Sequence, residues 1–120
     1  YAQSIPLLDY LIGEPIESVV LSPNQVIPVR IPSPERYAIH KLFSSQSRRS
    51  NRDKIRKDLD QAAVLAAALE EETPGRLVDE SKRLPREGKS ALKRGAAAAS
   101  KLLDAHPAGK EALLKIVGRR

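Results

Sequence analysis

The clearest helical pattern in this chain is residues 51–72, NRDKIRKDLDQAAVLAAALEEE. Its apolar residues recur at alternating spacings of four and three, which is typical of one buried face of an α-helix. These residues are Ile55, Leu59, Ala62, Ala66 and Leu69. Ser50 and Asp53 resemble a capping box with aspartate in the glutamate position, and Thr73-Pro74 ends the pattern. The segment therefore predicts a long helix over 51–72.

A second helix is predicted immediately upstream, over residues 34–47. Ser33 is a good N-cap residue, and Pro34 follows it at the first helical position. Apolar residues then recur at helical spacing, at Ala38, Ile39, Leu42 and Phe43. We expect Tyr37 and Phe43 to fill the core, and His40 to be partly buried and hydrogen-bonded.

Residues 5–32 predict extended structure. The segments 18–21 and 26–31 are rich in β-branched residues, and Ser22-Pro23-Asn24-Gln25 between them has turn chemistry. Together they predict a hairpin. Pro28 and Pro32 lack the amide hydrogen that a central strand needs, so the second strand should be an edge strand or end early.

Three shorter helices are expected after the long one, over 74–84, 86–105 and 107–117. Each has a proline near its start, namely Pro74, Pro85 and Pro107. Residues 96–99 are all alanine, a patch suited to close helix packing. The last 35 residues contain few large apolar groups, which predicts packing that is loose or supplied by chain outside this sequence.

The combined expectation is an α+β fold, mostly α, in which a short N-terminal β-hairpin or edge strands precede a bundle of about five helices. Residues 1–32 would complete a sheet of a larger domain, and residues 33–120 would form a helical subdomain. A chain of 120 residues can bury one modest core. Because it starts at Tyr1 and contains no methionine, we expect it to be an excerpt of a longer protein.

Composition excludes several classes of site. The chain has no cysteine, hence no disulfide and no thiolate metal site. His40 and His106 are too far apart in sequence for a metal-ligand motif, so a zinc site is not expected. Apolar runs are too short for a membrane span. We expect a soluble, cytoplasmic protein with no membrane partner; the sequence leaves its oligomeric state open.

The net charge of +6 is unevenly distributed. Residues 48–57 hold six basic groups and one acidic group, residues 58–81 hold one and seven, and residues 82–120 hold eleven and three. The long helix thus begins with basic residues and ends with Glu70, Glu71 and Glu72. This is the reverse of the arrangement that the helix dipole favours.

Two explanations of this inverted helix stay open. One is a solvated polar face with pairs four residues apart, such as Arg56 and Asp60. The other is an anion bound where backbone amides and cations converge. A short turn at 48–51 would fold the second helix back against the first. The cations would then form one cluster, consisting of Lys41, Arg48, Arg49, Lys54 and Lys57.

These residues also carry a family resemblance. The stretch IPVRIPSPERYAIHKL (27–42), then Arg48-Arg49, then KDLDQA (57–62) resembles a bacterial nucleotidyltransferase-fold family, and more distantly abortive-infection toxin-type nucleotidyltransferases. The resemblance covers roughly residues 8–70. It implies that Lys41, Arg49 or Arg48, and the Lys57-Asp58 pair match the family's positions. The cations would face nucleotide phosphates, and Asp58 would orient a cation.

The same resemblance places the family's glycine-containing segment and paired acidic metal ligands upstream of Tyr1. Asp58 and Asp60 are two apart on a helix and face different ways, so we assign neither as a metal ligand. No catalytic residue and no cofactor is assigned within this chain; Mg²⁺ is expected only if the upstream motif exists. Whether the parent protein is an active enzyme stays open.

The sequence therefore predicts the C-terminal helical part of a nucleotidyltransferase-like protein. Its basic cluster would bind a nucleoside triphosphate or a nucleic-acid backbone. The alternative is a non-enzymatic basic helical module, in which residues 82–120 bind nucleic acid or an acidic protein partner. Lys89, Lys93 and Arg94 fall near one helical face in that region.

Overall fold

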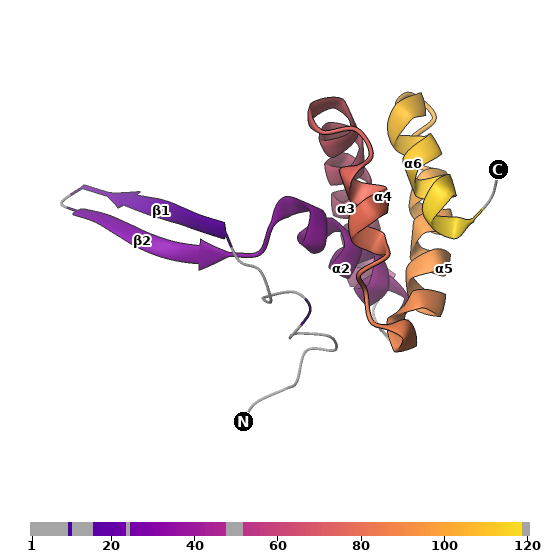
Figure 1. Cartoon of the computed structure of the whole chain (residues 1–120), viewed down its shortest axis with the longest axis horizontal. Helices are drawn as coiled ribbons and strands as arrows, with labels where there is room; N and C mark the ends of the chain where they lie inside the picture. The colour runs from indigo at the N-terminus through magenta and orange to yellow at the C-terminus, as the bar shows by residue number, and fades with distance from the viewer. Residues whose placement is uncertain (1–9, 11–15, 24, 48–51, 119–120) are drawn as a thin grey trace.

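The computed structural model describes residues 10, 16–23, 25–47 and 52–118. Figure 1 shows its elements in order. They are strands β1 (Ile16–Ser22) and β2 (Gln25–Ile31), helices α2 (Pro34–Ser47), α3 (Arg52–Glu72) and α4 (Arg76–Ser81), a 3₁₀ turn at Arg86–Gly88, and helices α5 (Lys89–Ser100) and α6 (Pro107–Val117). None of the described helices is both long and apolar enough to cross a membrane.

The two long helices confirm the predictions from the sequence, and their ends have the expected causes. Ser33 Oγ accepts a hydrogen bond of 3.2 Å from the backbone N–H of Arg36, which caps α2. Helix α3 ends at Glu72, and the backbone N–H of Thr73 still donates to Leu69 O at 2.7 Å. Ser50 lies outside the described residues, so the capping box stays a prediction.

The later helices exist where prolines predicted them, but two of them are shorter than the sequence predicted. The segment 74–84 contains only Arg76–Ser81 as helix, because Gly75 takes a left-handed backbone conformation with φ of 86° directly before it. The segment 86–105 divides into the 3₁₀ turn and α5, which ends at Ser100. Helix α6 has its predicted bounds, with Pro107 at its start.

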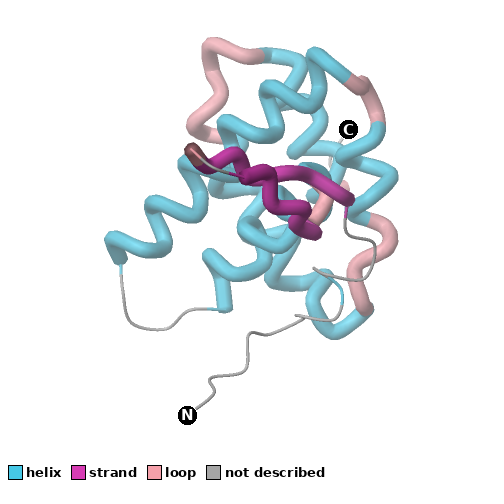
Figure 2. Tube along the Cα trace, turned by 90° about the vertical axis from the view of Figure 1, so that its left-hand side faces the viewer, coloured by secondary structure: helices cyan, strands magenta, loops and turns pink. Residues whose placement is uncertain are grey.

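The hydrophobic core lies among the helices. Helix α2 is central and makes extensive contacts with α3, α4 and α5, while α6 packs on α3 and α5 (Figure 1). Figure 2 shows the helices gathered behind the two strands. Fully buried apolar side chains come from each of these helices: Ala38, Ile39, Leu42, Ala62, Ala66, Leu77, Ala96, Ala99 and Leu113. The turn at 48–51 was expected to fold α3 back on α2, and the contact between the two helices confirms this.

Small residues bring the last helices close to the others. A Cβ atom built on Gly95 would lie 2.2 Å from the carbonyl oxygen of Leu42, so the backbones of α5 and α2 touch directly. Gly109 of α6 lies similarly against α3, where a Cβ would be 2.9 Å from Ala67 Cα. The expectation of loose packing was therefore wrong, because glycine and alanine replace large side chains by close helix approach.

The α+β expectation is wrong for the core, which is a helical bundle. An α+β fold requires a sheet covered by helices. Here β1 and β2 pair antiparallel with each other, from Ile16 opposite Ile31 to Ser22 opposite Gln25, and belong to a sheet of these two strands. In the described part of the chain, neither strand makes an extensive contact with a helix. Segments rich in β-branched residues predict extended backbone, but they do not predict whether helices cover the strands.

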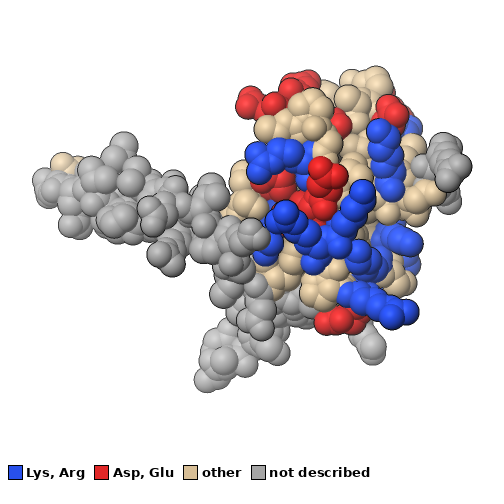
Figure 3. All heavy atoms as spheres, viewed as in Figure 1, with Lys and Arg blue, Asp and Glu red and all other residues tan. Residues whose placement is uncertain are grey.

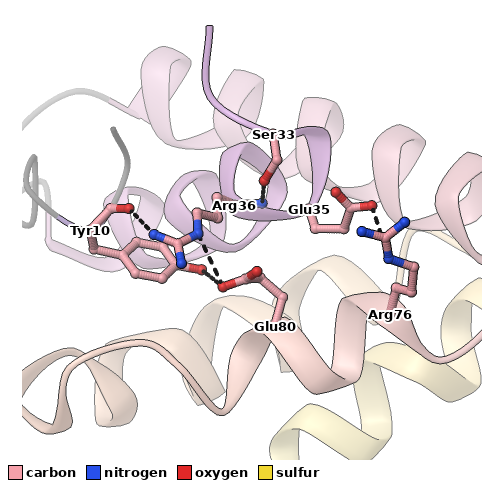
Figure 4. A network of polar contacts seen from close by, with 6 residues as sticks. All are labelled: Tyr10, Ser33, Glu35, Arg36, Arg76 and Glu80. Atoms are coloured by element: carbon pink, nitrogen blue, oxygen red, sulfur yellow. Dashed lines mark hydrogen bonds and ion pairs between the residues drawn. The ribbon is translucent and has the colours of Figure 1, made fainter. Parts of the chain in front are cut away.

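A buried polar network fixes α2 against α4 (Figure 4). The Arg36 guanidinium donates to the backbone oxygen of Tyr10 at 2.8 Å and lies 3.4 Å from the Glu80 carboxylate. It also lies 4.9 Å from the centre of the Tyr10 ring. The Tyr10 hydroxyl donates to the same carboxylate oxygen at 3.1 Å. One arginine thus connects three parts of the chain.

Tyr10 makes the stability of the protein sensitive to alkaline pH. Burial raises the pKa of the Tyr10 phenol above its ordinary value of 10.0, and the negative charge of Glu80 raises it further. The fold favours the neutral phenol, so this contribution to stability is complete below about pH 10 and is lost as the pH rises further. We expect the free energy of unfolding in urea to fall less steeply between about pH 9 and about pH 11 in Tyr10→Phe than in the parent protein. Equal slopes for Tyr10→Phe and the parent would contradict the assignment.

Candidate functional site

A largely buried ion pair joins α2 to α3. Lys41 Nζ donates to Asp58 Oδ1 at 3.2 Å, and the side chains are 22% and 6% exposed. A carboxylate this far from water is costly unless it is paired and hydrogen-bonded. Asp58 is therefore held in the helix interface together with the lysine. The structure brings these two predicted residues into direct contact.

Tyr37 lies beside the ion pair. The Lys41 ammonium is 5.3 Å from the centre of the Tyr37 ring, which comes one helical turn earlier on α2. Tyr37 is 38% exposed, so its predicted place in the core was wrong. Tyrosine carries a hydroxyl group that can stay in contact with water, whereas phenylalanine has no polar group, and Phe43 is buried as predicted.

An open hollow of about 350 Å³ adjoins this pair. It is lined by Tyr37 from α2 and by Asp60, Gln61, Val64 and Leu65 from α3. Gln61 follows Asp58 by three residues, so the two lie on the same side of α3. Gln61 Oε1 is buried and has no hydrogen-bond partner among the described residues. Because Gln61 also lines the hollow, its amide is a polar group of this wall whose oxygen lacks a partner among the described residues.

The remaining predicted cations are placed less centrally. Lys54 and Lys57 are both exposed on the first turns of α3. Lys54 precedes Asp58 by four residues and shares its side of the helix, whereas Lys57 lies about 100° away around it. Arg48 and Arg49 lie outside the described residues. That all five cations enclose one ligand stays a prediction.

Sequence reasoning missed Tyr37 and Gln61 as site residues. Tyr37 precedes Lys41 by four residues and Gln61 follows Asp58 by three, so helical spacing alone placed each beside a residue already under consideration. The missing information was which face of each helix is covered. That depends on the packing of the bundle.

Other titratable groups have structural roles. His40 is buried, and its Nδ1 lies 3.3 Å from Ser44 Oγ, which confirms a hydrogen-bonded histidine. Asp58 is buried while Asp60 is exposed, so the two aspartates do face different ways. Within the residues that the structure describes, no group of three or more histidine, aspartate or glutamate side chains could hold a metal ion.

Comparison with known proteins gives one positive result. A family model described as nucleotidyltransferase matches residues 1–85. The match covers more than half of the 120 residues and includes both the ion pair and the hollow. It ends before α5, so α5 and α6 lie beyond it. No curated protein and no solved structure matches the chain.

Proposed function

Because the chain belongs to the nucleotidyltransferase family, we propose that the hollow beside the α2–α3 ion pair binds a nucleotide, with its phosphates toward Lys41. The observation that carries this proposal is the convergence of an ammonium group, an aromatic ring and an amide whose oxygen lacks a partner among the described residues. These are the three kinds of group that recognise a phosphate, a base plane and a base edge.

The ion pair positions the lysine. A lysine ammonium has three N–H donors, and Asp58 accepts one of them. Two donors then remain for phosphate oxygens, from a nitrogen atom that the carboxylate holds in place. Asp58 is a positioning residue in this proposal. Lys54 and Lys57 add positive charge at the start of α3, where the helix dipole also favours an anion.

The hollow suits the nucleoside. Tyr37 offers a partly exposed ring for stacking, and the base–aromatic contact contributes about 1–3 kcal/mol in other proteins. Val64 and Leu65 supply an apolar wall. Turned toward the hollow, the Gln61 amide would bond to polar atoms on the edge of the base, and its oxygen would gain the partner that it lacks among the described residues.

The proposal assigns nucleotide binding to this chain and no catalytic step. Two-metal phosphoryl transfer needs carboxylates that hold two ions about 3.5–4 Å apart. Asp58 is engaged by Lys41, and Asp60 supplies a single carboxylate to the described lining of the hollow. The residues of this site therefore do not fit a pair of Mg²⁺ ions.

We expect the double variant Lys41→Ala/Lys57→Ala to bind ribonucleoside triphosphates at least about tenfold more weakly than the parent in isothermal titration calorimetry. A charge-assisted hydrogen bond contributes about 1.5–3 kcal/mol, and tenfold corresponds to about 1.4 kcal/mol. The control Lys101→Ala/Lys110→Ala removes the same charge elsewhere. Unaltered affinity in the first variant would refute the proposal.

Two further variants distinguish a specific loss of triphosphate binding from a loss of folding. Lys57→Ala changes only an exposed side chain and should still weaken binding. Asp58→Asn separates two roles of the carboxylate: a positioning role predicts weaker triphosphate binding, whereas mere neutralisation of Lys41 predicts tighter binding. Circular dichroism of each variant establishes that it is folded.

A further inference from the structure

A second group of cationic side chains lies among the later helices, α4, α5 and α6. A hollow of about 210 Å³ is lined by four lysines that come from three helical segments. They are Lys82, Lys89, Lys93 and Lys115. Its other lining residues are Val78, Ser81, Leu92 and Ile116, so no acidic residue belongs to the described lining.

Local structure explains only part of this concentration of charge. Lys89 Nζ donates to the backbone oxygen of Lys82 at 3.0 Å, where a cation complements the C-terminal end of α4. Lys115 lies 3.8 Å from Glu111, but both side chains are well exposed, and such a pair contributes little. Lys93 has neither explanation. It lies near the start of α5, whose first turn contains no acidic residue.

The hollow belongs to a wider basic surface. Figure 3 shows lysine and arginine side chains gathered over α4 and α5, with acidic side chains beside them near α4. Arg86, Lys93 and Arg94 are exposed around the start of α5. Arg83 instead shares a neighbouring hollow with Asp79 and Glu80, which bounds the basic surface on that side. Adjacent like charges repel one another, so an anion bound there would relieve the repulsion.

We propose that this four-lysine hollow binds the phosphodiester backbone of nucleic acid. Lysines act as point charges for phosphates and read no base. The described lining contains no aromatic ring for stacking, and the volume is below the roughly 300–1,000 Å³ typical of small-molecule pockets. Exposed arginines around it extend the positive surface, as successive phosphates require.

This site is separate from the proposed nucleotide site. The two hollows share no lining residue, and Lys89, Lys93 and Lys115 lie outside the family match. Nucleotide binding and nucleic-acid binding stood as alternatives in the sequence. On the structure they are compatible, because they use different helices, and either can fail without the other.

The test is fluorescence anisotropy of the whole chain with labelled single-stranded RNA and duplex DNA, at about 50 mM and about 200 mM salt. The parent should bind both, and more weakly at the higher salt. Changing all four lysines to glutamine should weaken binding at least about tenfold. It should also lower the slope of log K against log salt by about 3, since each phosphate contact contributes about 0.7–0.9.

A matched pair of double variants separates the site from net charge. Lys89→Gln/Lys93→Gln should weaken binding more than Lys101→Gln/Lys110→Gln, which removes the same charge. The four-lysine variant should keep its calorimetric affinity for triphosphate. Parent-like affinity and salt slope in the four-lysine variant, or equal losses in the two double variants, would overturn the proposal. So would binding of inorganic tripolyphosphate by a parent protein that binds neither polynucleotide.

Discussion

Replacing Arg36 with methionine is expected to destabilise the protein by about 3–5 kcal/mol, measured by urea unfolding at neutral pH. Arg36 and Glu80 are only 10% and 12% exposed, and Arg36 also holds the backbone of Tyr10. Methionine keeps much of the side-chain volume but removes the charge. Glu80 would then be a nearly buried carboxylate without its cation. The free-energy cost of that unpaired charge outweighs the small change in packing.

A second arginine in the same network provides the control. Arg76 lies 3.8 Å from Glu35, but its side chain is 65% exposed (Figure 4). Glu35 is only 10% exposed, but water reaches the Arg76 end of the pair, so Arg76→Met should destabilise the protein clearly less than Arg36→Met does. The two variants remove the same charge from α2–α4 contacts that differ in burial. Equal destabilisation would show that burial of the Arg36–Glu80 pair is not what matters.

This buried network also bears on the proposed nucleotide site. Arg36 and Tyr37 are neighbours on α2, with Arg36 buried against α4 and Tyr37 partly exposed beside α3. Fixing Arg36 therefore fixes the rotation of α2 about its axis. That rotation sets the direction in which Tyr37 and Lys41 face.

Helices could be predicted from this sequence because their signals are local. The N-cap Ser33, the alternating apolar spacing in α3 and Pro107 each act within a few residues. The fold class could not, because it depends on what the strands pack against. The link from Tyr10 to Glu80 spans 70 residues and leaves no periodic trace in the sequence.

In the candidate sites too, local features could be predicted from the sequence, whereas features of the packed structure could not. Lys41 and Asp58 could each be singled out from the sequence, but the ion pair between them appears only where α2 packs on α3. Gln61 could not be singled out, since its unsatisfied oxygen is a property of the packed interface. In the basic region, the sequence indicated Lys89 and Lys93 on one helix. Only tertiary structure adds Lys82 and Lys115 from the neighbouring segments.

Gly95→Ala is expected to destabilise the protein by about 2–3 kcal/mol, although alanine is the better helix former by about 1 kcal/mol. The added methyl group would lie 2.2 Å from Leu42 O and 2.8 Å from Leu42 C. Both are backbone atoms, so no side chain can rotate away. The helices α2 and α5 must separate instead, which loses contacts along the whole interface.

Gly109→Ala is the graded comparison, because its methyl group would lie 2.9 Å from the nearest atom, Ala67 Cα. A smaller displacement of α6 from α3 relieves that contact, so its loss of stability should be clearly smaller. Urea unfolding of both variants tests this order. If Gly95→Ala were as stable as the parent, or more so, glycine would be acting there only as a poor helix former. That result would refute the direct contact between the α2 and α5 backbones. It would also refute the close packing that holds α2 at the centre of the bundle.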